Sequence, residues 1–110
     1  MQADQEKQRI IAAMIGLAHS LAAAPADSTA QAFAARVKAA ISQLAAPDYQ
    51  GAKLYAAIAP LRRDIAYAVS LDHWVMTPAQ AVDWREFQVA TQYAWEDFQR
   101  GLSVLRTLPG

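Results

Sequence analysis

The stretch TPAQAVDWREFQVATQYAWEDFQRG, residues 77–101, carries the clearest structural signal in this chain. Thr77 and Gln80 have the spacing of a capping box, in which each side chain accepts a hydrogen bond from the other residue's backbone N–H. Pro78 stands at the first helical position, where its missing N–H costs nothing. No further proline occurs until near the end of the chain, so the pattern predicts one helix of about 45 Å that ends near Thr107.

Most aromatic residues of this helix fall on one face. At about 100° per residue, one arc of the width of an amphipathic face collects them together with smaller apolar residues. The members of this stripe are Trp84, Phe87, Thr91, Ala94, Trp95, Phe98, Leu102 and Leu105. We expect the stripe to pack in a core, because large rings fill the space between alanine-lined helices. A flat ligand held between Trp84, Phe87 and the other helices is the alternative.

A second apolar strip, called the outer strip here, lies opposite the aromatic stripe. Its apolar members are Val82, Val89, Tyr93 and Val104, and the charged Arg100 among them is included in the predicted interface. Single exposed apolar residues are common, whereas several along one helix indicate an interaction surface. Two copies could pack antiparallel about a two-fold axis, with Arg100 of one copy near Glu86 or Asp97 of the other. The strip therefore predicts a homodimer, with another protein partner or burial within one chain as alternatives.

Three further helices are predicted earlier in the chain, the first over about residues 3–23. Their apolar residues recur every three or four positions, which is the spacing of one helix face. The faces carry Ile10, Met14, Leu17 and Leu21, widened by Ile11, Ile15 and Ala18, in the first helix; Phe33, Val37, Ala40, Ile41 and Leu44 in the second; and Leu54, Ile58, Leu61, Ile65, Ala68 and Val69 in the third.

Prolines and short polar residues set the ends of these helices. Pro25 and Pro47 close the first and second helices, because proline disfavours helical geometry in the residue before it. Asp27 or Ser28 can cap the second helix, and Asp48 can cap the third, by accepting a hydrogen bond from a free backbone N–H.

Pro60 falls inside the third helix, where it removes a backbone donor and clashes with the preceding turn. We expect a kink there, or a split into two helices. No stretch alternates as a strand does. Short connections favour antiparallel neighbours, so the predicted fold is a single-domain, all-α, antiparallel four-helix bundle with up-down-up-down order over residues 1–110.

Composition excludes several classes of function. Ten Lys and Arg balance ten Asp and Glu in 110 residues, which gives no attraction to nucleic acid. The absence of cysteine removes disulfides, thiol nucleophiles and thiolate metal sites. No Gly-rich phosphate loop, serine-nucleophile or zinc-helix motif occurs, and no uncharged run reaches the roughly 20 residues of a membrane span. We predict no catalytic residue, no metal site and no cofactor.

A pocket between the third and fourth helices, close to His73, is the alternative to an interaction surface. Its candidate lining is Tyr55, Tyr67, Asp72, His73, Trp74 and Trp84. His73 could transfer a proton or hold a metal there, but the pattern favours a polar residue at a helix end, where its charge suits the helix dipole. Arg62 and Arg63 could bind a phosphate or carboxylate with Lys53, but Asp64 competes for them.

Two features of the first helix remain. Ala12, Gly16 and Ser20 form a ridge of small residues that allows a second helix to approach closely, either within the chain or from a partner. The apolar run over residues 10–24 resembles a signal peptide, but acidic residues in its leader argue against one. We therefore expect a cytoplasmic protein, with a periplasmic or secreted location left open, that acts as a small non-enzymatic interaction module.

Overall fold

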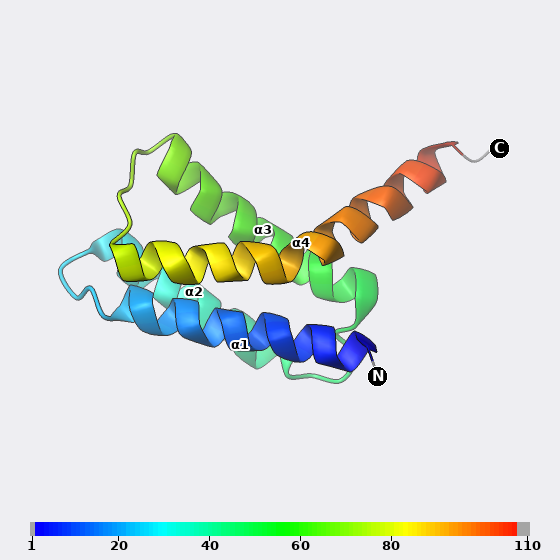
Figure 1. Cartoon of the computed structure of the whole chain (residues 1–110), viewed down its shortest axis with the longest axis horizontal. Coiled ribbons are helices and arrows are strands. Elements are labelled where there is room, and N and C mark those ends of the chain that lie inside the picture. Colours follow the sequence, from blue (N-terminus) through cyan, green and yellow to red (C-terminus); the bar gives the residue numbers. More distant parts are fainter. Residues whose placement is uncertain (1, 108–110) are drawn as a thin grey trace.

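Four helices make up the described part of the chain. The computed structural model describes the backbone of residues 2–107 and the side chains of residues 5–92. The helices are α1 (Gln2–Ala22), α2 (Ser28–Leu44), α3 (Gly51–Ser70) and α4 (Pro78–Thr107), and residues 2–107 contain no strand (Figure 1). The predicted all-α fold of four helices is thereby confirmed.

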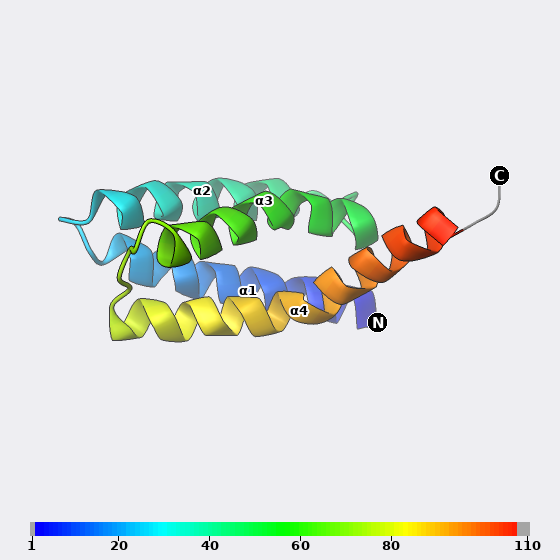
Figure 2. The same ribbon diagram turned by 90° about the horizontal axis from the view of Figure 1, so that it is seen from above.

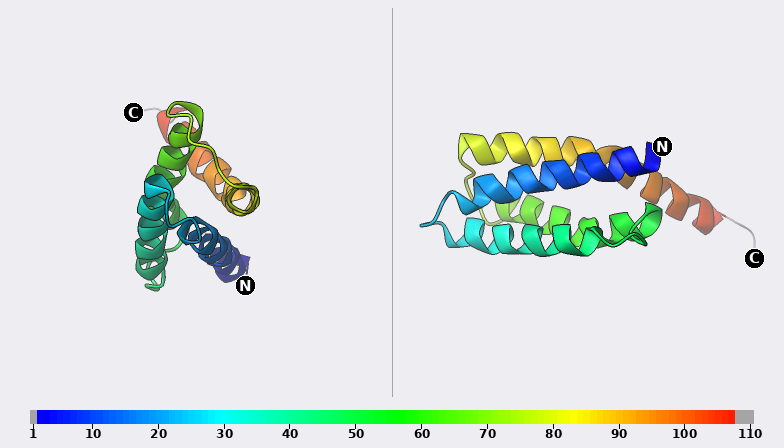
Figure 3. Two further views of the ribbon diagram at one scale, coloured as in Figure 1. Left: turned by 90° about the vertical axis from the view of Figure 1, so that its left-hand side faces the viewer. Right: turned by 90° about the horizontal axis from the view of Figure 1, so that it is seen from below.

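The helices form two layers. Figures 2 and 3 show α2 beside α3 in one layer and α1 beside α4 in the other. α1 packs most extensively, against both α2 and α4, whereas α3 contacts α2 and α4 over smaller areas. α3 is continuous through Pro60, so the helix does not split there, and a kink at Pro60 stays a prediction.

The apolar face of α1 forms the centre of the core. Ile10, Met14, Leu17 and Leu21 have no exposed surface, as their spacing predicts. The predicted faces of α2 and α3 join them through their buried or half-buried members. Ile15 is a correction: it was expected to widen the face of α1, but 55% of its surface is exposed, because it lies on the side that faces neither α2 nor α4.

The buried faces of α3 and α4 largely follow the sequence pattern. Trp84, Phe87 and Thr91 are buried in α4, and the rings of Trp84 and Phe87 stack with their centroids 5.7 Å apart. The buried face of α3 consists of Leu54, Ile58, Leu61, Ile65 and Ala68. Val69 departs from the pattern and is 38% exposed, because it lies at the C-terminal end of α3, which packs less extensively than α1.

The predicted capping box at the start of α4 is confirmed. The Thr77 N–H donates to Gln80 Oε1 over 3.0 Å, and the Gln80 N–H donates to Thr77 Oγ1 over 3.2 Å. The Gln80 side chain is fully buried, and its Nε2 lies 3.5 Å from the backbone oxygen of Ser20. The same glutamine therefore caps α4 and connects it to the end of α1.

The caps of α2 and α3 differ from each other. Asp27 caps α2 as predicted, because its Oδ1 accepts from the Ala30 N–H over 3.1 Å. Asp48 does not cap α3. The N-cap position is Gln50, which makes no side-chain capping bond, while Asp48 pairs with Lys53 across the first turn.

The small-residue ridge of α1 is used within the chain. A Cβ placed on Gly16 would lie 3.5 Å from Asp83 Oδ1 of α4, so the two helices run close together at this position. Ser20 is buried beside the start of α4, whereas Ala12 is exposed. Of the two predicted uses of this ridge, the contact within one chain is the one observed.

The C-terminal part of α4 leaves the other helices. The first half of α4 lies along α1, and the part shown in orange and red extends beyond the ends of α1 and α3 (Figures 1 and 2). The expectation that Trp95 and Phe98 belong to the core lies outside the described side chains, as do the positions from Tyr93 onwards in general.

Removing the Phe87 ring should destabilise the fold strongly. The ring has no exposed surface, and truncation of a large core ring costs about 3–5 kcal/mol. Urea denaturation of Phe87→Ala should show a loss of this size. Val75→Ala, at a position that is 83% exposed, should change the free energy of unfolding by less than about 0.5 kcal/mol. Equal losses for both variants would contradict the assigned core.

Alanine at position 16 should stabilise the protein, although Gly16 lies at a close helix contact. The new methyl group would meet Asp83 at an ordinary contact distance of 3.5 Å, and alanine favours helix over glycine by about 0.8–1.0 kcal/mol. Urea denaturation should therefore show a gain in stability for Gly16→Ala. A loss for the alanine variant would mean that α1 and α4 lie closer than described.

Candidate functional site

The outer strip of α4 is exposed where its side chains are described. Val82 is 62% exposed and Val89 is 45% exposed, and Glu86 lies between them on the surface. Val82 and Val89 lie on the side of α4 opposite the buried Trp84 and Phe87, whereas Glu86 borders a hollow between α4 and α1. The remaining members of the outer strip, Tyr93, Arg100 and Val104, lie outside the described side chains.

The residues predicted to line a pocket near His73 are not gathered there. Tyr67 is 53% exposed on α3, and Asp72 and His73 are exposed in the connection between α3 and α4. His73 has a left-handed backbone with φ of 56°, which is uncommon for a residue with a side chain. Its position at the end of α3, where the chain changes direction, gives His73 a role in the turn.

Trp74 packs against α2. Its indole N–H donates to Asp27 Oδ2 over 2.9 Å, and its ring lies 5.5 Å from that of Phe33. The side chain therefore joins the connection after α3 to the start of α2. These bonds lower the pKa of Asp27, with the Trp74 hydrogen bond as the largest cause and the Ala30 N–H second.

Tyr55 lies away from His73. Its hydroxyl donates to Glu6 Oε1 of α1 over 2.9 Å, and this bond joins the N-terminal half of α3 to α1. Of the six predicted pocket residues, Trp84 is the one that lines a cavity between α3 and α4.

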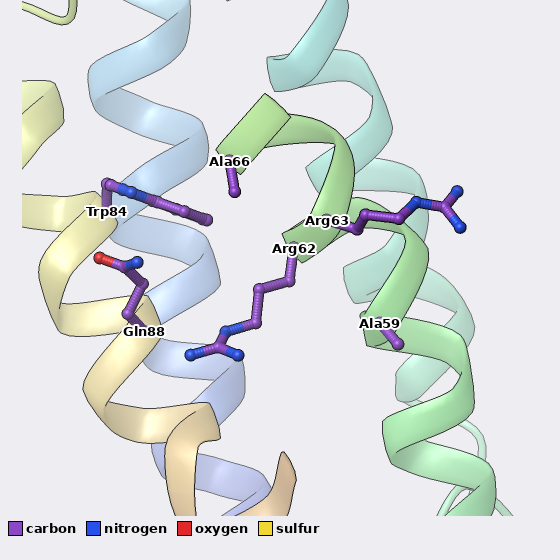
Figure 4. A pocket seen from close by; sticks show the side chains of 6 residues that line it. All are labelled: Ala59, Arg62, Arg63, Ala66, Trp84 and Gln88. Carbon is purple, nitrogen blue, oxygen red and sulfur yellow. The ribbon is translucent and has the colours of Figure 1, made fainter. Parts of the chain in front are cut away.

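That cavity is partly open and has a volume of about 190 Å³. Its lining consists of Ala59, Arg62, Arg63, Ala66, Trp84 and Gln88 (Figure 4). Figure 4 shows Arg62 reaching from α3 towards α4, the Trp84 ring pointing back towards α3, and Arg63 turned the other way. The small side chains of Ala59 and Ala66 leave the space that these larger groups surround.

From the sequence, Arg62 was considered only together with its neighbour Arg63, as two basic residues that could bind a phosphate or carboxylate. The structure separates the two arginines. Arg63 Nε lies 3.1 Å from Asp64 Oδ1, and Arg36 of α2 lies 3.0 Å from the other oxygen of Asp64. These two contacts, Arg63 first, lower the pKa of Asp64. Lys53, the predicted third cation, pairs with Asp48 instead.

Arg62 itself has no such partner within the described part of the chain. Its Nε atom is buried and makes no hydrogen bond to any described group. Burial lowers the pKa of the Arg62 guanidinium, since desolvation disfavours the charged form. Sequence spacing could not identify this arginine, because adjacent residues on a helix point to different sides and the neighbouring helix decides which side is buried.

A second hollow lies between α1 and α4, next to Gly16. It has a volume of about 290 Å³, and its charged lining residues are Arg9, Asp83 and Glu86. Both signs of charge face this hollow, so it offers no strong selectivity for an anion or a cation. We assign it no ligand.

Two properties of the described residues bear on partners. These residues contain no cluster of three or more His, Asp or Glu side chains arranged to hold a metal ion. Within the same part of the chain, no helix is both long enough and apolar enough to cross a membrane.

Comparisons with protein-family models, curated proteins and solved structures found no match to this chain.

The bond between Trp74 and Asp27 should make stability depend on pH. Because the folded pKa of Asp27 is lowered, its contribution is present above the unfolded pKa of about 3.8 and is lost as the pH falls through the folded value. The melting temperature of the wild type should therefore fall more steeply than that of Asp27→Asn between about pH 5 and pH 2.

Asp72→Asn is the matched control, because Asp72 is exposed in the same connection. Its melting curve should follow that of the wild type across this pH range. Trp74→Phe removes the indole donor that bonds to Asp27. In this background Asp27→Asn should therefore change the pH dependence of the melting temperature less than it does in the wild type. Parallel curves for the wild type and Asp27→Asn would contradict the assigned role of Asp27.

Proposed function

We propose that the protein is a non-enzymatic helical interaction module that forms a homodimer through the outer strip of α4. The observation that carries this proposal is the exposure of Val82 and Val89 on a helix whose C-terminal part extends beyond its own bundle (Figure 1). An apolar face without a neighbour in its own chain favours association.

The outer strip is complementary to itself in the antiparallel direction. Glu86 lies seven residues before Tyr93, and Arg100 lies seven residues after it. Val82 and Val104 lie eleven residues on either side of the same tyrosine. Two α4 helices that cross antiparallel with a two-fold axis at Tyr93 therefore pair Glu86 with Arg100 twice and bring Val82 opposite Val104. This symmetry supports a second copy of the chain as the partner over an unrelated protein.

The size of the contact indicates that more than the outer strip takes part. The strip is about 33 Å long, and one helix is about 10 Å wide, which gives about 330 Å² on each copy. Stable interfaces bury about 800 Å² on each partner. The surface on either side of the outer strip therefore has to contribute the rest of the interface.

Two finer features of the fold belong to the same proposal. We take the helix directions to alternate, because the contacts of each helix are with its neighbours in the chain and between α1 and α4. We also take Pro60 to bend α3, because proline cannot donate to the preceding turn. A bend in α3 accounts for its smaller contact with α4. The proposed module acts in the cytoplasm.

The dimer is tested by light scattering and analytical ultracentrifugation in the micromolar range. The wild type should have twice the mass of one chain, and Tyr93→Glu should be a folded monomer, because it places two carboxylates together at the two-fold axis. Val75→Glu adds the same charge at an exposed valine outside the outer strip and should leave the dimer intact.

Charge reversal tests the register of the pair. Glu86→Arg and Arg100→Glu should each weaken the dimer, and the double variant should restore it, because both opposed pairs are re-formed in the reverse order. A monomeric wild type throughout the micromolar range would refute the homodimer. Unfolding of Tyr93→Glu would instead assign Tyr93 to a core within the chain.

A further inference from the structure

The cavity between α3 and α4 contains a cation that the rest of the described chain does not neutralise. The neighbouring carboxylate, Asp64, is shared between Arg63 and Arg36. Among the residues whose side chains are described, no Asp or Glu lines the cavity. A guanidinium with a buried, unbonded Nε is unfavourable for folding, because it has lost water without gaining an acceptor. An anion that enters the cavity would supply that acceptor.

The other walls specify what kind of anion fits. Trp84 is 9% exposed and offers the edge and face of a large ring, and the methyl groups of Ala59 and Ala66 complete an apolar surface. Gln88 adds an amide that can donate one hydrogen bond (Figure 4). A fully hydrated inorganic ion would leave most of this apolar surface uncovered.

We propose that this cavity binds a small carboxylate with a flat apolar body, such as an aromatic monocarboxylic acid. The planar fork of Arg62 matches the two oxygens of a carboxylate, and the ring of the ligand packs against Trp84. The volume of about 190 Å³ is of the right order, since an apolar cavity of about 150 Å³ holds benzene. The site is separate from the outer strip, which lies on the other side of α4 from Trp84.

Sodium benzoate is the probe, measured by isothermal titration calorimetry. A ligand of this size should bind with a dissociation constant on the order of a millimolar. Arg62→Met, which keeps the length of the side chain and removes the fork, should weaken binding at least about ten-fold. Arg85→Gln removes the same charge from an exposed position next to Trp84 in the sequence and should change the affinity less than about two-fold.

Two other compounds test the chemistry of the ligand. Benzyl alcohol has the ring without the charge and should not bind measurably. Inorganic phosphate has the charge without the ring and should bind more weakly than benzoate. Equal binding of phosphate and benzoate would overturn the assignment of an apolar carboxylate, and so would binding of benzyl alcohol.

NMR spectroscopy tests where in the molecule benzoate binds. In ¹H–¹⁵N spectra benzoate should shift the indole N–H signal of Trp84. The signal of Trp74, whose N–H is bonded to Asp27, should stay in place. A shift confined to Trp74, or equal shifts of both signals, would overturn the location.

The stability of the variants separates a binding role from a structural one. Without ligand, Arg62→Met should melt at the same temperature as the wild type or above it, because the buried polar atom is removed. Benzoate should raise the melting temperature of the wild type and leave that of Arg62→Met unchanged. A lower melting temperature for Arg62→Met, together with no effect of benzoate on the wild type, would show that Arg62 serves the fold alone. Neither result depends on whether the chain dimerises.

Discussion

The burial of α1 between α2 and α4 is the constraint on which the other parts of this structure depend. Ile10, Met14, Leu17 and Leu21 lose all contact with water, and each fully buried side chain of this size contributes about 1.5–3 kcal/mol. α4 packs on the other side of α1, where Gly16 faces Asp83. Since α1 takes the largest contacts with both partners, α3 is left with smaller ones, and the cavity that holds Arg62 occurs where α3 meets α4.

Single polar side chains at helix ends hold these elements in place by serving two helices at once. Gln80 completes the capping box of α4 and reaches the backbone of α1 at Ser20. Asp27 caps α2 and accepts the indole N–H of Trp74 from the connection before α4. Lys7 of α1, almost fully buried, donates to the Ala46 oxygen just beyond α2, where a cation suits the end of a helix. The ends of the bundle are therefore closed by specific bonds.

The proposed activities use the two sides of α4 in different ways. Its inner side presents Trp84 to α3 and to Arg62, and its outer side presents Val82 and Val89 to solvent. The buried Nε of Arg62, which has no acceptor among the described residues, opposes stability, and the exposed Val82 and Val89 oppose solubility in an isolated chain. Under the two proposals, each would be relieved by a partner of complementary chemistry: a carboxylate in the cavity, and a second copy of the chain on the outer strip.

The features that the sequence predicts correctly are those whose interacting residues lie close together along the chain. Helix ends, the capping box of Thr77 and Gln80, the cap at Asp27 and the main buried faces depend on residues three or four positions apart, so the sequence by itself determined them. The exposure of Ile15 and the separation of Arg62 from Arg63 depend on which helix lies opposite. The same holds for the predicted pocket near His73, whose residues the chain distributes among contacts with α1, α2 and solvent. Only the tertiary structure decided these, because periodicity defines a face of a helix but does not identify its neighbour.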